Sequence, residues 1–216
     1  MTGKIQLTEG RKMSKGLLLV VSAPSAGGKG TILKELFQRN GNLRMSVSAT
    51  TRQPRDGEEQ GKHYYFINRE EFQQLIDSGK MLEYAEYVGN LYGTPKGPVD
   101  QWLDEGHDVV LEIEVQGGAQ IKEIVPDCVS VFITPPSLEV LEKRLRGRGT
   151  EEEGTILKRL ATARQELTQA GNYDYVVVND RLEDAVDDML AILRSEKLRY
   201  ARDPGFVEGL LAAEKA

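Results

Sequence analysis

Four short stretches of the chain are almost continuously apolar, and polar or glycine-containing segments separate them. They are Leu17–Val21, Val109–Ile113, Val129–Ile133 and Tyr175–Val178. Strands buried on both faces of a parallel sheet have this pattern, whereas strands with one solvated face alternate apolar and polar residues. We therefore expect these stretches to be strands of one parallel sheet.

Amphipathic periodicity fills the segments between the expected strands. Residues 31–39 place apolar side chains on one stripe, residues 156–167 do the same, and residues 186–193 repeat the spacing. Strands that alternate with such helices predict a three-layer α/β fold with a parallel central sheet.

Two parts of the chain depart from this alternation. Residues 46–95 hold short strand-like runs around one helical stretch, which predicts a small, partly antiparallel lobe inserted into the core. Residues 144–158 are rich in glycine and charge, which fits either a mobile lid or a solvated surface loop. We expect residues 1–15 to be a flexible extension, 16–200 the folded domain and 201–216 a tail whose apolar stripe packs on the core or on a second subunit.

Composition and charge restrict the class of protein. The 216 residues suffice for one domain with inserted lobes, and a net charge of −6 argues against a general binder of nucleic acid or acidic membranes. Cys128 is the lone cysteine, which fits a reducing compartment, and the longest apolar runs are too short to cross a membrane. These features predict a cytoplasmic protein, monomeric or homodimeric, without nucleic-acid or membrane partners.

The first expected strand runs directly into SAPSAGGKGT, which is followed by a helix. Phosphate-binding loops need this order, because glycines let backbone N–H groups approach the anion at the positive end of the helix. Gly28 and Lys29 stand where the pattern G-x-x-x-x-G-K-[ST] requires them, and Gly27 adds a further glycine to the loop. A lysine at this position neutralises the β and γ phosphates.

The loop departs from that pattern at two positions. Ala23 replaces the first glycine, which is acceptable at negative φ, and Gly30 replaces the hydroxyl residue. Thr31 is adjacent, and Mg²⁺ keeps several waters, so it can be held largely through water. A glycine-rich turn with a chance lysine is the alternative, but strand, loop and helix together favour an ATP site. Its expected residues are Ala23, Pro24, Ser25, Ala26, Gly27, Gly28, Lys29, Gly30 and Thr31.

A second group of candidate ligands lies in the inserted lobe. Arg52 and Arg55 flank Pro54 in a polar loop, and two guanidinium groups so placed can each make forked hydrogen bonds to one phosphate. Tyr64 and Tyr92 follow. Each has an ordinary structural explanation when it is taken alone: solvated arginines and core tyrosines.

The complete set of motifs resembles the guanylate kinase family of P-loop nucleoside monophosphate kinases. The matching segments lie in family order over about residues 17–200: SAPSAGGKGT, SVSATTRQPRDGEEQGKHYYF, YGTP, LEIEVQGG, TPPSLEVLEKRLRGRGTEEE and VVVND. The resemblance implies a kinase that transfers the γ-phosphoryl group of MgATP to GMP or dGMP, giving ADP and GDP (or dGDP), in purine nucleotide metabolism.

The resemblance also implies an acceptor site. Its residues are Arg52, Arg55, Tyr64 and Tyr92 for the GMP phosphate, Ser48, Glu83 and Thr94 for the base, and Glu112 and Glu114 for the nucleotide and the waters of Mg²⁺. Guanine presents two adjacent donors, N1–H and the N2 amino group, to one carboxylate, whereas adenine presents an acceptor at N1. A buried carboxylate left unpaired rejects the wrong base, so Glu83 is the expected selector. The family usually has aspartates at 112 and 114, which leaves the roles of these glutamates open.

On the donor side, the resemblance assigns catalytic roles to four cations: Lys29, Arg144, Arg148 and Arg159. It also places Asn179 beside the adenine of ATP. Phosphoryl transfer needs positioning and positive charge more than covalent chemistry, and an ionised GMP oxygen needs no general base. Two alternatives remain: a non-catalytic guanylate-kinase-like binding module, and a kinase for another nucleoside monophosphate.

Overall fold

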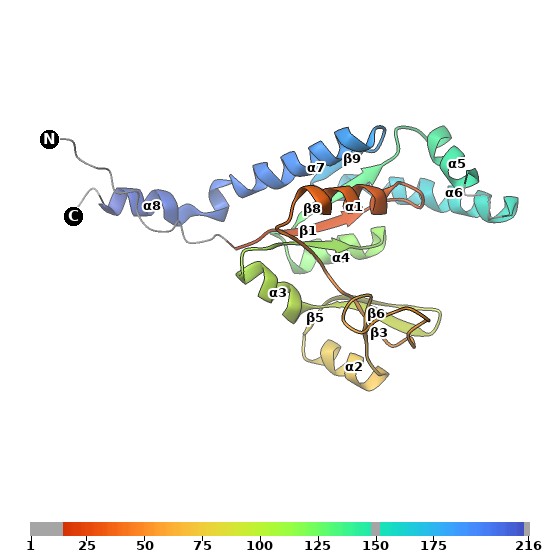
Figure 1. Ribbon diagram of the computed structural model, residues 1–216, viewed down its shortest axis with the longest axis horizontal. Coiled ribbons are helices and arrows are strands. Elements are labelled where there is room, and N and C mark those ends of the chain that lie inside the picture. Colours follow the sequence, from red (N-terminus) through yellow and green to blue (C-terminus); the bar gives the residue numbers. More distant parts are fainter. Residues whose placement is uncertain (1–14, 148–151, 214–216) are drawn as a thin grey trace.

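The computed structural model describes residues 15–147 and 152–213, and its central sheet has five parallel strands (Figure 1). In spatial order they are β2 (Leu43–Met45), β7 (Asp108–Glu112), β1 (Leu18–Ser22), β8 (Val129–Thr134) and β9 (Tyr175–Val178). The predicted α/β class is confirmed, and the four apolar runs are β1, β7, β8 and β9. The short strand β2 was not predicted, because only Leu43 of its three residues is buried.

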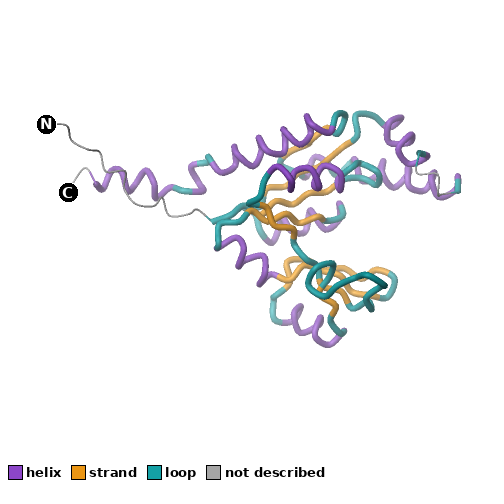
Figure 2. Tube along the Cα trace, viewed as in Figure 1, coloured by secondary structure: helices purple, strands orange, loops and turns teal. Residues whose placement is uncertain are grey.

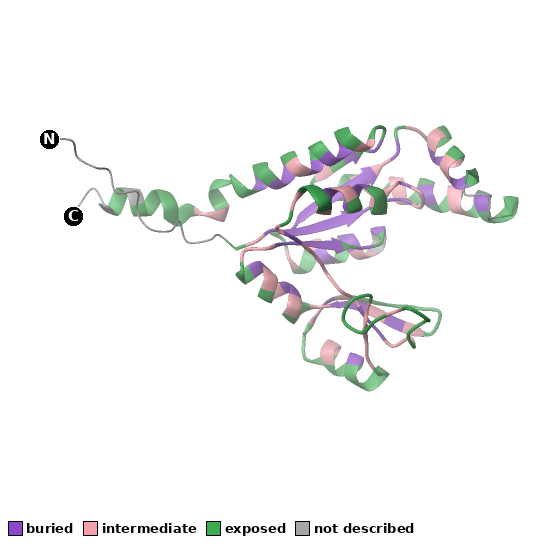
Figure 3. Ribbon diagram, in the orientation of Figure 1, coloured by how far each residue is buried: buried purple, intermediate pink, exposed green. Residues whose placement is uncertain are grey.

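Helices cover both faces of this sheet. Alternate residues of β1 point to opposite faces: Leu19 and Val21 pack with α1 (Lys29–Arg39) and α7 (Leu182–Lys197). Leu18 and Val20 pack with α3 and α4 on the other face. Figure 3 shows the strands as the buried layer between these helices. The bounds of the second pair are Lys96–Asp104 (α3) and Val115–Ile124 (α4).

A second sheet, of mixed direction, forms the lobe that lies below the central sheet in Figure 2. Its order is β4-β3-β6-β5, with β3 (Ala49–Thr50), β4 (Tyr65–Phe66), β5 (Met81–Tyr87) and β6 (Asn90–Pro95), and it is accompanied by α2 (Arg69–Asp77). The lobe has its own small core of Ala49, Phe72 and Leu91, so it holds together apart from the main core.

Two helices after β8 form a third small unit. They are α5 (Leu138–Arg146) and α6 (Glu153–Leu167), which pack through Leu141, Leu145 and Ile156. Arg146 bonds to Glu153 across the junction. Residues 148–151 lie between the two helices and outside the described residues, so much of the expected lid, including Arg148, is not placed.

The chain continues beyond β9 and α7 into a tail. The short 3₁₀ helices Ala170–Asn172 and Tyr200–Arg202 precede β9 and α8 (Pro204–Ala213) respectively. Figure 1 shows α8 pointing away from the core, and Val207 and Leu211 on it are exposed. The expected packing of this stripe on the core is not seen, and packing on a second subunit stays a prediction. No helix in the described ranges is long and apolar enough to cross a membrane.

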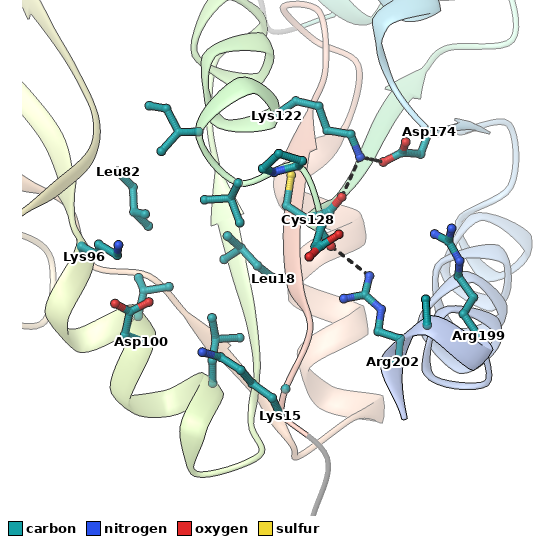
Figure 4. Close-up of a pocket in the computed structure, with 18 residues that line it drawn as sticks. Lys15, Leu18, Leu82, Lys96, Asp100, Lys122, Cys128, Asp174, Arg199 and Arg202 are labelled. Carbon is teal, nitrogen blue, oxygen red and sulfur yellow. Dashed lines mark hydrogen bonds and ion pairs between the residues drawn. The ribbon is translucent and has the colours of Figure 1, made fainter. Parts of the chain in front are cut away.

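A cavity of about 640 Å³ lies where the lobe joins the core (Figure 4). Its lining includes Leu82 from the lobe and Cys128 from the core. Lys122 donates to the Asp174 carboxylate at 2.6 Å, and Arg202 donates to a main-chain carbonyl at 2.9 Å, so these two cations are already held by protein groups. The cavity borders the residues before β1, whereas the glycine-rich loop follows β1 at its other end.

Candidate active site

The glycine-rich loop joins β1 to α1 in the conformation that its sequence requires. Gly28 is the residue before α1 and has φ 92°, a left-handed value that favours glycine. A β-carbon on Gly28 would lie 2.1 Å from Nδ2 of Asn179, so no larger residue fits without a shift. Ala23 is not among the described residues with positive φ, so an alanine can replace the first glycine of the pattern without backbone strain. Ala26 has φ 63°, a left-handed value that is uncommon for residues other than glycine.

Lys29 lies between the loop and the carboxyl end of β7. Its Nζ donates to the carbonyl oxygen of Ile113 at 3.1 Å and lies 3.8 Å from Oε1 of Glu112. Glu114 is the residue before α4 and is exposed, as is Thr31 in the first turn of α1. The structure therefore brings the end of β7 beside the loop, where ligands of parallel α/β sheets bind.

Arg144 reaches the same loop from α5 through Asn179. Its Nη2 donates to the carbonyl oxygen of Asn179 at 2.9 Å, and Nδ2 of Asn179 donates to the carbonyl oxygen of Gly27 at 2.9 Å. The other terminal nitrogen, Nη1, is buried, has no hydrogen-bond partner in the described structure and lies 3.9 Å from the β-carbon position of Gly28. A buried guanidinium nitrogen left unpaired beside such a loop indicates an anionic ligand. Arg159 is half-buried on α6.

Glu83 and Thr94 lie opposite each other on β5 and β6, and the Thr94 hydroxyl donates to Oε1 of Glu83 at 2.7 Å. Oε2 lies 3.9 Å from the β-carbon position of Gly117 on α4, so this lobe carboxylate faces the core. Burial raises the pKa of Glu83, and the hydrogen bonds from Thr94 oppose that rise. Ser48 is half-buried just before β3.

Three of the four predicted phosphate ligands form one cluster. The Arg52 guanidinium carbon lies 5.5 Å from the centre of the Tyr64 ring, and the rings of Tyr64 and Tyr92 are 6.1 Å apart. Hydrogen bonding to Glu58 raises the pKa of Arg52, and the Tyr92 hydroxyl contributes in the same direction. The side chain of Arg55 is exposed, and the structure does not bring it into this cluster.

Comparisons with known proteins identify the family of this chain. The family model described as guanylate kinase matches residues 15–196. The chain belongs to the guanylate kinase family. A guanylate kinase of Desulfitobacterium hafniense (strain Y51) is 50% identical over 199 residues, which cover 92% of this chain and all of that protein. One of Lactococcus lactis subsp. lactis (strain IL1403) is 53% identical, over 87% of this chain and 92% of that protein.

A solved structure agrees as well. The crystal structure of guanylate kinase from Anaplasma phagocytophilum superposes with a TM-score of 0.67 at 37% identity, covering 88% of this chain and 90% of that chain. The parallel core and the inserted sheet described above are thus those of a guanylate kinase fold.

Two carboxylates at these sites were not singled out from the sequence. Glu58 accepts from both terminal nitrogens of Arg52, at 2.9 Å each, and this holds its pKa down to about 2. Glu166 on α6 accepts from the backbone N–H of Ser25 in the glycine-rich loop at 3.2 Å, while burial and the charge of Glu114 raise its pKa. No local pattern marks Glu166, because its partner lies 141 residues away in the sequence.

The donor set beside the loop fits the Mg²⁺ that the family implies. Within the described ranges no three His, Cys, Asp or Glu residues gather as a metal cage. Mg²⁺ in kinase sites is instead bound by one or two carboxylates, by substrate phosphates and by water. Glu112 supplies such a carboxylate 3.8 Å from Lys29, and Thr31 supplies an exposed hydroxyl at the same end of the loop.

Proposed function

We infer that this chain transfers the γ-phosphoryl group of ATP to GMP, giving ADP and GDP. The observation that carries the inference is the half-buried Glu83 carboxylate, which accepts from Thr94 and faces the core helix α4. Its second oxygen, Oε2, points toward α4, 3.9 Å from the β-carbon position of Gly117. Guanine supplies two donors to such a carboxylate, and burial makes an unmatched base costly.

On the donor side, the backbone of residues 23–31 binds the ATP phosphates at the N-terminus of α1. Lys29 leaves its contacts with Ile113 and Glu112 to neutralise the β and γ phosphates. Arg144 supplies its unpaired buried nitrogen to the transferring group, and Arg148 and Arg159 add charge from the lid. Asn179 couples Arg144 to the loop.

On the acceptor side, Arg52, Tyr64 and Tyr92 hold the GMP phosphate. Arg55 joins them when the lobe closes, and Ser48 contacts the base next to Glu83. The nucleophile is an oxygen of the GMP phosphate, which is largely ionised near neutral pH, so no general base is required.

The family's Mg²⁺ fits beside Glu112, Glu114 and Thr31, where it would neutralise charge on the phosphate oxygens of ATP. In-line transfer spreads negative charge over the equatorial oxygens of the γ-phosphoryl group. Lys29 and the arginines therefore stabilise the transition state mainly by preorganised positive charge.

The two alternatives have less support. A non-catalytic module would need neither the Lys29 side chain beside the loop nor an unpaired Arg144 nitrogen directed at it, and the structure has both. A kinase for another base would gain less from this carboxylate, because adenine, cytosine and uracil do not present two adjacent donor groups on the Watson–Crick edge. We place the reaction in the cytoplasm, which fits the lone buried Cys128.

The deciding experiment is a coupled ADP-release assay with MgATP and four acceptors: GMP, AMP, CMP and UMP. We expect turnover with GMP and at most traces with the others. The Glu83→Gln variant should lose much of this selectivity, because its amide donates where the carboxylate accepts. Turnover that is equal for all acceptors, or GMP binding without any turnover, would contradict the proposal.

A further inference from the structure

The loop that carries Arg52 and Arg55 is organised around a single carboxylate, Glu58. Its Oε2 accepts from Nη1 of Arg52 at 2.9 Å and from the backbone N–H of Arg55 at 2.7 Å, and its Oε1 accepts from Nη2 of Arg52 at 2.9 Å. One carboxylate therefore connects the two arginines that the proposed function assigns to the acceptor phosphate.

The donors of Arg52 can be counted. A guanidinium group has five N–H bonds in a rigid plane. Glu58 takes one from Nη1 and one from Nη2, and the carbonyl oxygen of Gln53 takes the second from Nη1 at 2.7 Å. The two that remain, on Nε and Nη2, lie side by side on one edge of the plane, and neither is taken by Glu58 or Gln53. Tyr92, itself an expected phosphate ligand, is the other polar neighbour of this guanidinium. Such an edge matches two oxygens of a phosphate.

Aromatic rings fix the plane of that guanidinium. Its central carbon lies 5.5 Å from the centre of the Tyr64 ring and 5.8 Å from that of Phe66. The side chains of Arg52 and Glu58 are 15% and 19% exposed, so their ion pair is partly shielded from water. The orientation of the remaining edge is thus set by protein groups before any ligand arrives.

We propose that Glu58 is a positioning residue for the acceptor: it holds Arg52 so that the Nε and Nη2 edge receives the GMP phosphate. This proposal rests on the proposed function. The opposite interpretation is that Glu58 is an internal substitute for phosphate, which GMP must displace. The donor count favours positioning, because Glu58 takes neither of the two N–H bonds on that edge.

The two interpretations predict changes of opposite sign for Glu58→Gln. Removing a negative charge next to a phosphate dianion strengthens GMP binding if Glu58 only competes. If Glu58 positions Arg52, the variant binds GMP more weakly, because a glutamine has one acceptor oxygen and cannot hold both terminal nitrogens. We expect KM for GMP to rise on the order of tenfold or more, with KM for ATP little changed.

Guanosine separates positioning of the phosphate from a general structural effect. Direct binding of GMP and of guanosine should be measured for the wild type, Glu58→Gln and a matched control, Glu59→Gln. Glu59 is the adjacent exposed glutamate, and its carboxylate pairs with Lys62 rather than Arg52. We expect Glu58→Gln to weaken GMP and leave guanosine unchanged, and Glu59→Gln to change neither by more than about twofold.

A double-mutant cycle with Arg52→Lys completes the test. A lysine cannot present a two-donor edge, so adding Glu58→Gln to Arg52→Lys should weaken GMP binding no further. Additive losses, or an unchanged or tighter GMP complex in Glu58→Gln, would overturn the proposal. Each variant counts as correctly folded if its thermal unfolding transition and its KM for ATP match those of the wild type. Absence of GMP-dependent turnover in the wild type would instead contradict the proposed function itself.

Discussion

Glu83 links local structure to the base recognition that we propose. Its position on β5 pairs it with Thr94 on β6, and its partial burial raises its pKa. A carboxyl group with a raised pKa binds its proton at a higher pH than an ordinary glutamate, whose pKa is about 4.3. Once protonated, Glu83 can no longer accept from both guanine donors.

Base binding should depend on pH through Glu83. Guanosine affinity should fall as the pH is lowered through the raised pKa of Glu83. This fall should begin at a higher pH than it would for a glutamate with an ordinary pKa. Guanosine is the suitable ligand because the phosphate of GMP itself titrates near pH 6. Calorimetry from about pH 4 to 8 measures this loss. In Glu83→Gln the affinity should be weak and flat with pH, and an identical acid limb in both proteins would refute the assignment.

Val88 is a residue whose side chain conflicts with its backbone. It lies in the two-residue turn between β5 and β6 with φ 48°, and 79% of its surface is exposed. Left-handed φ is costly for a β-branched residue, whereas asparagine tolerates it. Val88→Asn should raise the free energy of unfolding by about 1 kcal/mol, which is roughly 2–4 °C in Tm for a chain of this size.

The comparison variant for Val88 is Val176→Asn. Val176 is 53% exposed in strand β9 and is not among the described residues with positive φ. Asparagine is disfavoured in strands, so this variant should be neutral or less stable. Equal stabilisation by both substitutions would mean that φ at residue 88 is not the cause.

Among the elements, the junction of the glycine-rich loop with α1 is the most constrained. Asn179 at the end of β9 contacts Gly27, and Arg144 on α5 contacts Asn179, so three elements meet there. The second glycine of the loop, Gly28, has positive φ and direct contact with Asn179, whereas Gly30 has no neighbour within 4 Å of its β-carbon position.

These neighbouring glycines predict opposite effects on stability. Gly28→Ala should lower the free energy of unfolding by about 2 kcal/mol or more, because φ 92° is unfavourable and Asn179 must move. Gly30→Ala in the first turn of α1 should raise it by a few tenths to about 1 kcal/mol. Chemical denaturation of both variants measures the difference, and a shift of the same sign in both would contradict this account.

At the scale of the whole molecule, the lobe with its own core is expected to move relative to the central sheet. A kinase must exclude water from the phosphoryl group, and closing the lobe and the lid over both substrates does so. The loop between β3 and β4 carries the exposed residues Arg55 and Lys62, which are trypsin sites. Their cleavage rate therefore reports on the state of the lobe.

We predict that GMP together with MgATP slows tryptic cleavage after Arg55 and Lys62 more than either nucleotide alone. A non-transferable ATP analogue keeps the substrates from turning over during the measurement. Lys158 is exposed on α6, and its cleavage rate in the same digest reports on the state of the lid. Full protection by the ATP analogue alone would show that closure is not coupled to the acceptor.

The local pattern of the chain determined most of its elements. Continuous apolar runs predicted β1, β7, β8 and β9, and amphipathic stripes predicted α1, α6 and α7, because burial on two faces or on one leaves a periodic trace in sequence. Strand β2 was missed because three residues with one buried side chain leave no such trace. The motifs also indicated the phosphate loop and a second anion site.

Only the tertiary structure decided how those motifs meet. It placed Arg144 on Asn179, Glu166 on Ser25 and the Glu83 carboxylate against α4, through contacts between residues far apart in the chain. It also separated Arg52, which is held in an aromatic cluster, from the exposed Arg55, although both stand in one short motif. The periodicity of apolar residues indicates which faces of the helices and strands are buried, and the motifs indicate which reactive and charged groups are present. The partner of a polar group depends on how distant elements pack, and that packing leaves no local pattern.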